Sequence, residues 1–399
     1  MINLKKILSC AIMILCIVSL FSCGDSKNYG ECGGEGGYGD NLKWKLDDDG
    51  TLTISGKGKM SSYSNIGYPA EWTSESKKDT IKKVVIEDGV TSIGSDSFYE
   101  CSNITEIDIP DSVTDIGMYA FYGCSSLQEV TISDDVTTIE THTFERCASL
   151  EKVVIPDGVQ TIGREAFCLC KSLTEINIPD SVEIISESAF AGCENLKKVT
   201  IPETLKECEK GAFSNTEFLN QYTRKNQPLI INNIVVDGSG CTGDVVIPDG
   251  VTEIGREAFA CTEYYDHESI SSIVLPNSIR IIRAGAFAYC KDLEDINFPE
   301  GLKIIEKSAF YGCDNMPFIV FLPESLEEIH SIGYSVIKLV VLNPELDISF
   351  FDVNKGGVVY CPRGSKAQEY AEEKGYECIL LEEMQDVNEF LISNLYDFE

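Results

Sequence analysis

Residues 155–177 read IPDGVQTIGREAFCLCKSLTEIN, and residues 178–200 repeat the pattern as IPDSVEIISESAFAGCENLKKVT. Five such units of 23 residues follow one another from Ile86 to Thr200 without insertion or deletion. Valine, isoleucine and phenylalanine each recur at a fixed place in the unit, and so does cysteine: Cys101, Cys124, Cys147, Cys170 and Cys193. A fixed period of this length predicts a solenoid of stacked coils rather than a globular enzyme core.

The composition of one unit explains why the coil closes. Glu175 and Asn177 flank Ile176 with the alternation of a short strand, and the Pro-Asp-Ser sequence at 179–181 is typical of a turn. The phenylalanine, cysteine and leucine places are three residues apart, which fits a short helical turn or corner. A lone coil buries too little apolar surface to offset its lost chain entropy, so the coils must stack.

The segment before the repeats indicates export. Lys5 and Lys6 precede an apolar run, and residues 1–22 fit a secretory signal peptide. The sequence Leu-Phe-Ser-Cys that ends at Cys23 resembles the lipobox of bacterial lipoproteins, in which the cysteine becomes the lipidated N-terminus. An ordinary signal peptide with a cysteine near its cleavage site is the alternative. We expect residues 23–39 to be a lipidated, glycine-rich linker.

Caps are expected at both ends of the array. Alternating apolar residues around the turn at 47–50 predict a β-hairpin, and with Trp44 and Trp72 they place an N-terminal cap at residues 40–85. The repeats continue over residues 86–341, with irregular stretches at 208–246 and 260–274. The run at 229–236 predicts a hairpin in place of one coil. Ser365 and Gly375 delimit a short helix in a C-terminal cap at 342–381, before an acidic tail at 382–399.

The repeated unit resembles the BspA-like leucine-rich repeats of bacterial surface proteins, over roughly Asp40 to Leu381. The resemblance implies a right-handed leucine-rich repeat coil with parallel β-strands, short helical turns or corners, a hairpin N-terminal cap and an α/β C-terminal cap. The family is associated with exported proteins that bind host or bacterial surface components. It carries no catalytic motif that could be transferred to this chain.

Charge and the scarcity of histidine narrow the function further. The chain has 32 basic and 65 acidic residues, a net charge of −33, which argues against nucleic acid as a direct ligand. None of the three histidines, His142, His267 and His330, stands in a catalytic spacing. His142 occupies a variable place and is expected to be a surface residue, whereas His267 beside Tyr264 and Tyr265 is the cluster to test first. We expect no enzyme, no cofactor and no metal site.

The binding surface is expected on the strand face of the stacked coils. Outward positions recur at Glu106, Glu129, Lys152, Glu175, Asn177 and Lys198, and the loop with Tyr264 and Tyr265 could extend them. The alternatives are a merely solvated sheet face and a site in the irregular insert at 215–246. The cysteine column is expected to hold buried free thiols that act as small hydrophobic groups, although stacked coils bring cysteines within disulfide range.

Together these features predict a monomeric lipoprotein, anchored to the outer face of the membrane in the bacterial cell envelope. It would present the array to a host or bacterial surface protein or polysaccharide. A mainly structural envelope component without a specific ligand is the first alternative, and a surface hydrolase is the second.

Overall fold

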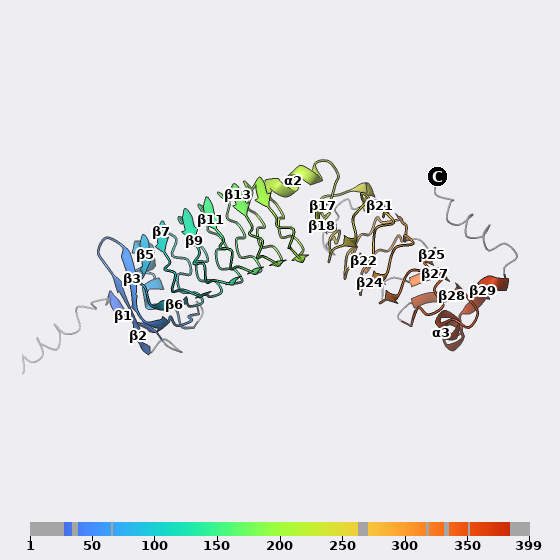
Figure 1. Cartoon of the computed structure of the whole chain (residues 1–399), viewed down its shortest axis with the longest axis horizontal. Coiled ribbons are helices and arrows are strands. Elements are labelled where there is room, and N and C mark those ends of the chain that lie inside the picture. Colours follow the sequence, from blue (N-terminus) through green and yellow to red (C-terminus); the bar gives the residue numbers. More distant parts are fainter. Residues whose placement is uncertain are drawn as a thin grey trace, which may run out of the picture.

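The computed structural model of the chain describes residues 28–33, 39–64, 67–261, 270–316, 319–330, 335–349 and 352–383. The chain winds into an elongated solenoid, and the predicted fold class is confirmed (Figure 1). Its first array consists of the regular coils before helix α2, and its second array consists of the coils that follow the insert. None of the helices in the described part has the length and apolar character needed to cross a bilayer.

Each coil of the first array contributes one strand to a long-strand stack and one to a short-strand stack. The long-strand stack contains β5 (Lys83–Ile86), β7 (Glu106–Asp108), β9 (Glu129–Thr131), β11 (Lys152–Val154), β13 (Glu175–Asn177) and β15 (Lys198–Thr200). The short-strand stack contains β6 (Val90–Ile93), β8 (Asp115–Ile116), β10 (Thr138–Ile139), β12 (Thr161–Ile162), β14 (Ile184–Ile185) and β16 (Glu207–Cys208). Both stacks are parallel, and paired residues lie 23 positions apart, as Lys152 and Glu129 do. The sequence period is therefore the strand register.

The third side of each coil consists of tight turns that bury a ladder of phenylalanine rings. Phe121 and Phe144 stack with ring centroids 5.3 Å apart, and Phe144 and Phe167 stack at 5.4 Å. These rings are fully buried. Flat aromatic groups repeated at one coil spacing thus fill the solenoid along its axis, and a single unit could not provide this packing.

The cysteine column lies beside the rings and is buried and unbridged. Four of its thiols do more than the predicted hydrophobic filling, because they donate to the phenylalanine carbonyl of the preceding coil: Cys124 to Phe98 at 3.3 Å, Cys147 to Phe121 at 3.2 Å, Cys170 to Phe144 at 3.2 Å and Cys193 to Phe167 at 3.1 Å. Burial raises the pKa of the Cys101 thiol to about 12. The column therefore supplies hydrogen bonds between coils and stays in the unreactive thiol form.

The predicted N-terminal hairpin is confirmed by the antiparallel pairing of β2 (Gly39–Leu46) and β3 (Thr51–Gly56). Strand β3 pairs in parallel with β5, so the hairpin continues directly into the long-strand stack. Trp44 and Trp72 pack with ring centroids 5.6 Å apart, and the Trp72 indole donates to the Ser97 carbonyl at 2.8 Å. Short elements complete this end: β4 (Gly58–Lys59), η1 (Glu71–Thr73) and η2 (Lys78–Thr80).

Part of the glycine-rich segment that the sequence predicts as a flexible linker forms a strand instead. Strand β1 (Tyr29–Gly33) pairs antiparallel with β2 and buries Cys32. Its glycines are explained by close packing, because a Cβ on Gly30 would lie 2.5 Å from Nε1 of Trp44. Glycine composition alone does not distinguish a loose linker from a strand that lies against a bulky ring.

The insert contains the predicted hairpin and, in addition, a helix that the sequence interpretation missed. Helix α2 (Glu217–Thr223) is capped by the preceding Thr216, whose hydroxyl accepts a hydrogen bond from the Leu219 amide at 3.1 Å. The hairpin joins β17 (Leu229–Ile231) and β18 (Ile234–Asp237) through two asparagines in left-handed conformation. A threonine N-cap before apolar residues was the available signal for the helix.

The second array repeats the same arrangement. Its strands are β19 (Gly243–Val246), β20 (Glu253–Ile254), β21 (Ile270–Val274), β22 (Ile281–Ile282), β23 (Asp295–Ile296), β24 (Ile304–Ile305) and β26 (Glu328–Ile329). The C-terminal end contains β25 (Ile319–Leu322), β27 (Ser335–Val341), β28 (Asp352–Cys361), α3 (Lys366–Lys374), β29 (Glu377–Leu380) and η3 (Leu381–Glu383). The predicted helix limits are confirmed, since the Ser365 side chain caps α3 and Gly375 follows it with φ 72°.

Candidate functional site

The strand-face strip is the row of exposed side chains on β7, β9, β11, β13 and β15. Along each of these strands the central residue points inward and the flanking residues point to solvent. The predicted outward positions are all exposed: Glu106, Glu129, Lys152, Glu175, Asn177 and Lys198. Parallel pairing places Glu129 beside Lys152 and Glu175 beside Lys198. The structure therefore brings these residues into one row.

Two ion pairs of opposite charge lie along this strip, after the acidic Glu106 on β7. The Lys152 ammonium lies 3.8 Å from the Glu129 carboxylate, and the Lys198 ammonium lies 3.8 Å from that of Glu175. These four side chains are 64–82% exposed, so each ion pair contributes little to stability. A row of exposed, paired charges can exchange its internal partners for those of a ligand at low cost in folding free energy.

A shallow groove lies at the N-terminal part of the strip. It has a volume of about 520 Å³ and is lined by residues of β7 and β9 together with Ile86, Ile109 and Pro110. The carboxylates of Glu106, Asp108 and Glu129 share this lining with the apolar groups. The groove is open and elongated across coils rather than enclosed, a shape that suits an extended chain better than a small molecule.

Exposed valines occur at one position of the coil in both arrays. Val154 is 43% exposed, and at the equivalent place before Ile-Pro or Leu-Pro, Val246 and Val274 are 69% and 50% exposed. Val246 and Val274 are paired neighbours on β19 and β21. All three valines stand directly before the turn motif, so the sequence position alone identifies them. Tyr264, Tyr265, His267 and Cys23 lie outside the described residues.

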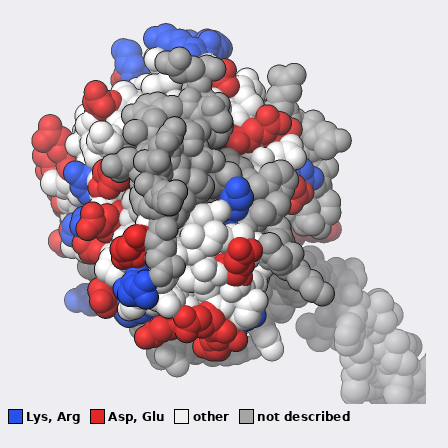
Figure 2. All heavy atoms as spheres, turned by 90° about the vertical axis from the view of Figure 1, so that its right-hand side faces the viewer, with Lys and Arg blue, Asp and Glu red and all other residues white. Residues whose placement is uncertain are grey.

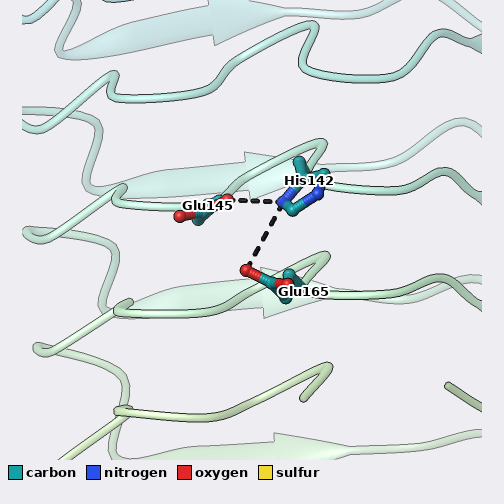
Figure 3. Close-up of side chains that lie close together, drawn as sticks. All are labelled: His142, Glu145 and Glu165. Atoms are coloured by element: carbon teal, nitrogen blue, oxygen red, sulfur yellow. Dashed lines mark hydrogen bonds and ion pairs between the residues drawn. The ribbon is translucent and has the colours of Figure 1, made fainter. Parts of the chain in front are cut away.

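A second cluster lies in the turns that follow the short strands β10 and β12. There His142, Glu145 and Glu165 converge (Figure 3). His142 and Glu145 belong to one coil and Glu165 belongs to the next. Nδ1 of His142 lies 2.5 Å from Oε2 of Glu145 and 3.7 Å from Oε2 of Glu165. Only 15% of the His142 side chain is exposed. His142, predicted as a surface residue, is thus partly buried and has carboxylate partners.

Local backbone geometry explains how these groups meet. His142 and Glu165 occupy the same place in successive units, and both are left-handed, with φ of 58° and 53°. The turn that requires this conformation directs the two side chains along the solenoid axis toward each other. Glu145 follows His142 by three residues in the same turn. The 23-residue spacing of His142 and Glu165 was a signal for this contact, but it does not give the side-chain direction.

Neighbouring groups hold the cluster in place. The Tyr119 ring stacks on the His142 imidazole at a centroid distance of 4.4 Å. Nε of Arg164 lies 3.1 Å from Oε1 of Glu165, and Nε of Arg146 lies 3.5 Å from Oε1 of Glu145. Burial, reinforced by the Glu145 charge, raises the pKa of the Tyr119 phenol. The tyrosine therefore stays neutral.

Charged side chains of both signs are visible at one end of the molecule (Figure 2). In Figure 2, which shows one end of the molecule, acidic side chains are spread over the visible surface and basic ones lie between them. The absence of nucleic acid as a ligand remains a prediction from composition.

Comparison with known proteins gives matches to repeat proteins. The BspA type leucine rich repeat region matches in six copies, over residues 76–176, 160–264 and 261–345. No curated protein matches the chain. A leucine-rich repeat protein from Bacteroides ovatus is 21% identical with a TM-score of 0.41, covering 86% of this chain and 98% of its own. One from Eubacterium ventriosum is 22% identical with a TM-score of 0.40, covering 74% and 92%. A leucine rich cell surface protein from Faecalibacterium prausnitzii is 22% identical with a TM-score of 0.36, covering 90% and 96%.

Proposed function

The chain belongs to the BspA type leucine-rich repeat family, and from this premise we propose that it is an exported surface protein that binds a protein or polysaccharide of a host or bacterial surface. The proposed contact surface is the strand-face strip. The observation that carries this proposal is the row of exposed side chains on β7 to β15, in which strand pairing sets Glu129 beside Lys152 and Glu175 beside Lys198, together with the open groove at β7 and β9. Such a surface offers a partner several parallel contacts at one spacing.

The strip is tested by removing its charges without changing the net charge. In the quadruple variant Glu129, Lys152, Glu175 and Lys198 all become Gln. We expect retention on surface fractions of host or bacterial cells to fall at least about 10-fold. The melting temperature should stay nearly constant because exposed ion pairs contribute little to stability. The measurement is a binding assay with the purified protein, paired with a thermal unfolding curve.

A matched control uses two ion pairs away from the strip. Lys171 pairs with Glu194 at 2.8 Å, and Lys206 pairs with Glu183 at 2.8 Å. Changing these four residues to Gln removes the same charges and should leave binding intact. Binding that survives the strip variant contradicts the proposal.

The insert is examined separately by substitution rather than by deletion. Phe218, Leu229 and Val236 of the insert are buried in the core, so deletion would expose apolar surface. Exposed Lys225 and Gln227 provide a suitable surface variant, with both changed to Ala. Binding lost in this variant and retained in the strip variant would place the site in the insert.

We propose in addition that Cys23 anchors the protein to the outer face of the membrane through a lipid. The sequence supports this through the apolar segment and the lipobox-like Leu-Phe-Ser-Cys. Attached acyl chains contribute about 0.8 kcal/mol per buried methylene, so anchoring requires no protein contact. Cys23→Ala should release the chain into the medium or leave it unprocessed, as seen by cell fractionation. An unchanged membrane fraction would contradict lipid anchoring.

A further inference from the structure

The cluster of His142, Glu145 and Glu165 has the donor set of a transition-metal site. Its nitrogen and the nearer oxygen atom of each carboxylate all lie within 4.8 Å of one another. One imidazole with two carboxylates suits a borderline ion such as Zn²⁺, whereas Ca²⁺ and Mg²⁺ prefer oxygen ligands alone. We propose that these three side chains bind one Zn²⁺-like ion across two successive coils.

The distances fit this proposal with a small adjustment. Zn²⁺ lies about 2.0–2.2 Å from nitrogen and oxygen ligands, so neighbouring ligand atoms of a tetrahedral site lie about 3.4 Å apart. Nδ1 of His142 is already 3.7 Å from Oε2 of Glu165. It is 2.5 Å from Oε2 of Glu145, a hydrogen-bond distance. The metal replaces the shared proton there, and the Glu145 side chain moves away by about 1 Å.

Groups around the cluster preorganise it for an ion. Arg164 and Arg146 lie beside the Oε1 atoms of Glu165 and Glu145, which leaves both Oε2 atoms directed toward the imidazole. Stacking of Tyr119 fixes the plane of the imidazole ring. Partners that orient metal ligands in this way raise metal affinity. The two guanidinium groups also repel the ion, so moderate rather than very tight binding follows.

The repeat architecture alone does not create this donor set. One unit earlier, the places of His142 and Glu145 hold Tyr119 and Tyr122, and one unit later, they hold Glu165 and Cys168. Among the residues that the structure describes, this is the one group of three histidine, cysteine or acidic side chains that lie close enough together to hold a metal ion. Three protein ligands leave at least one coordination position for water or for a carboxylate of a partner. The ion would also join two coils directly.

Zinc titration of the full-length protein tests the site. The protein carries no histidine tag, is stripped with a chelator, and is titrated with Zn²⁺ in excess Mg²⁺ to occupy scattered surface carboxylates. We expect one saturable site by calorimetry and a zinc-dependent rise in melting temperature. His142→Gln and Glu165→Gln should each weaken zinc binding at least about 10-fold. Unfolding curves without zinc establish that both variants are folded.

Two controls make the result specific. His330, whose Nε2 lies 2.8 Å from Glu328 on an exposed part of the second array, is changed to Gln. Glu187, which lies next along the axis near Arg164, is also changed to Gln. Both controls should bind zinc as the unmodified protein does. Absence of a saturable site, or zinc binding that persists in both cluster variants, would overturn the proposal.

Discussion

At the scale of single residues, Asp237 stands apart because its carboxylate is buried between the two arrays. Oδ1 accepts hydrogen bonds from the Ser239 amide at 3.0 Å and hydroxyl at 2.6 Å. Oδ2 is buried and has no partner among the described residues. Burial raises the pKa of Asp237, so the folded state favours the protonated acid.

This raised pKa predicts a pH dependence of stability. Below the unfolded pKa of about 3.9, Asp237 is protonated in both states and its contribution is fully present. As pH rises toward the higher folded pKa, the unfolded state ionises first and stability is lost. Asp237→Asn removes this loss, so its free energy of unfolding relative to the unmodified protein should increase from about pH 4 to pH 7. Urea unfolding at several pH values measures this difference.

An exposed aspartate provides the comparison for Asp237. Asp48→Asn, in the turn of the N-terminal hairpin, changes the same groups at a solvated position. It should show no such increase with pH. If the difference in free energy of unfolding between Asp237→Asn and the unmodified protein does not change with pH, the folded state does not raise the pKa of Asp237.

At the scale of elements, the turn of each coil requires two left-handed residues. The first place holds Asp96, Tyr119, His142, Glu165, Ser188 and Gly211, and the second holds Glu100, Gly123, Arg146, Leu169, Gly192 and Asn215. Left-handed conformation costs a non-glycine residue roughly 1–2 kcal/mol. The solenoid thus tolerates strain at one turn per coil, because the neighbouring coils hydrogen-bond that turn on both sides.

Glycine at these places avoids the strain of the left-handed conformation, so replacing it should cost stability. Gly192 has φ 71°, and a Cβ there would lie 2.6 Å from Cδ2 of Leu169. We expect Gly192→Ala to lower the free energy of unfolding by about 1–2 kcal/mol. The same place in an earlier coil holds exposed Glu100 with φ 55°. Glu100→Gly should change the free energy of unfolding by less than about 0.5 kcal/mol, because the relieved strain is offset by the greater entropy of the unfolded chain. Urea unfolding measures both variants. Equal changes in the free energy of unfolding would show that the left-handed conformation does not determine the stability of these turns.

At the scale of the whole molecule, the insert divides the solenoid into two hydrophobic cores. One core runs from Cys32 to Val236, and the other begins at Val235 and continues to Ala371. The sheet formed by β10, β12, β14 and β16 ends at this point, and the sheet that runs from β17 and β18 to β26 begins. Figure 1 shows α2 at this division. Polar contacts cross it, such as the Asn232 amide that donates to three carbonyls of the first array.

Two cores predict that damage to one array is contained there. Phe144→Leu removes ring stacking in the first core, and Phe287→Leu does so in the second; each should lower the stability of its own array by about 1–2 kcal/mol. Hydrogen exchange measured on peptides from each array separates the effects. We expect faster exchange in the array that carries the substitution and little change in the other. Equal changes in both arrays would show that the molecule unfolds as one cooperative unit.

The sequence by itself determined the coil, the strand register and the two faces of each strand. Positions 23 residues apart become neighbours, so the outward direction of Glu175 and Asn177 and the burial of Phe167 follow from the period. The hairpin at the N-terminus and the caps of α3 were also predictable, because local turn and capping preferences govern them.

Only the tertiary structure decided what the period does not encode. The strand in the glycine-rich segment depends on the Trp44 ring against Gly30, which is a contact of one unique cap. The His142 cluster depends on how the left-handed turns and the two arginines direct the carboxylates. The sequence shows only that Glu165 occupies the same place as His142 in the next unit. A repeat specifies which coils are adjacent, whereas the direction of a polar side chain follows from the particular charges and rings around it.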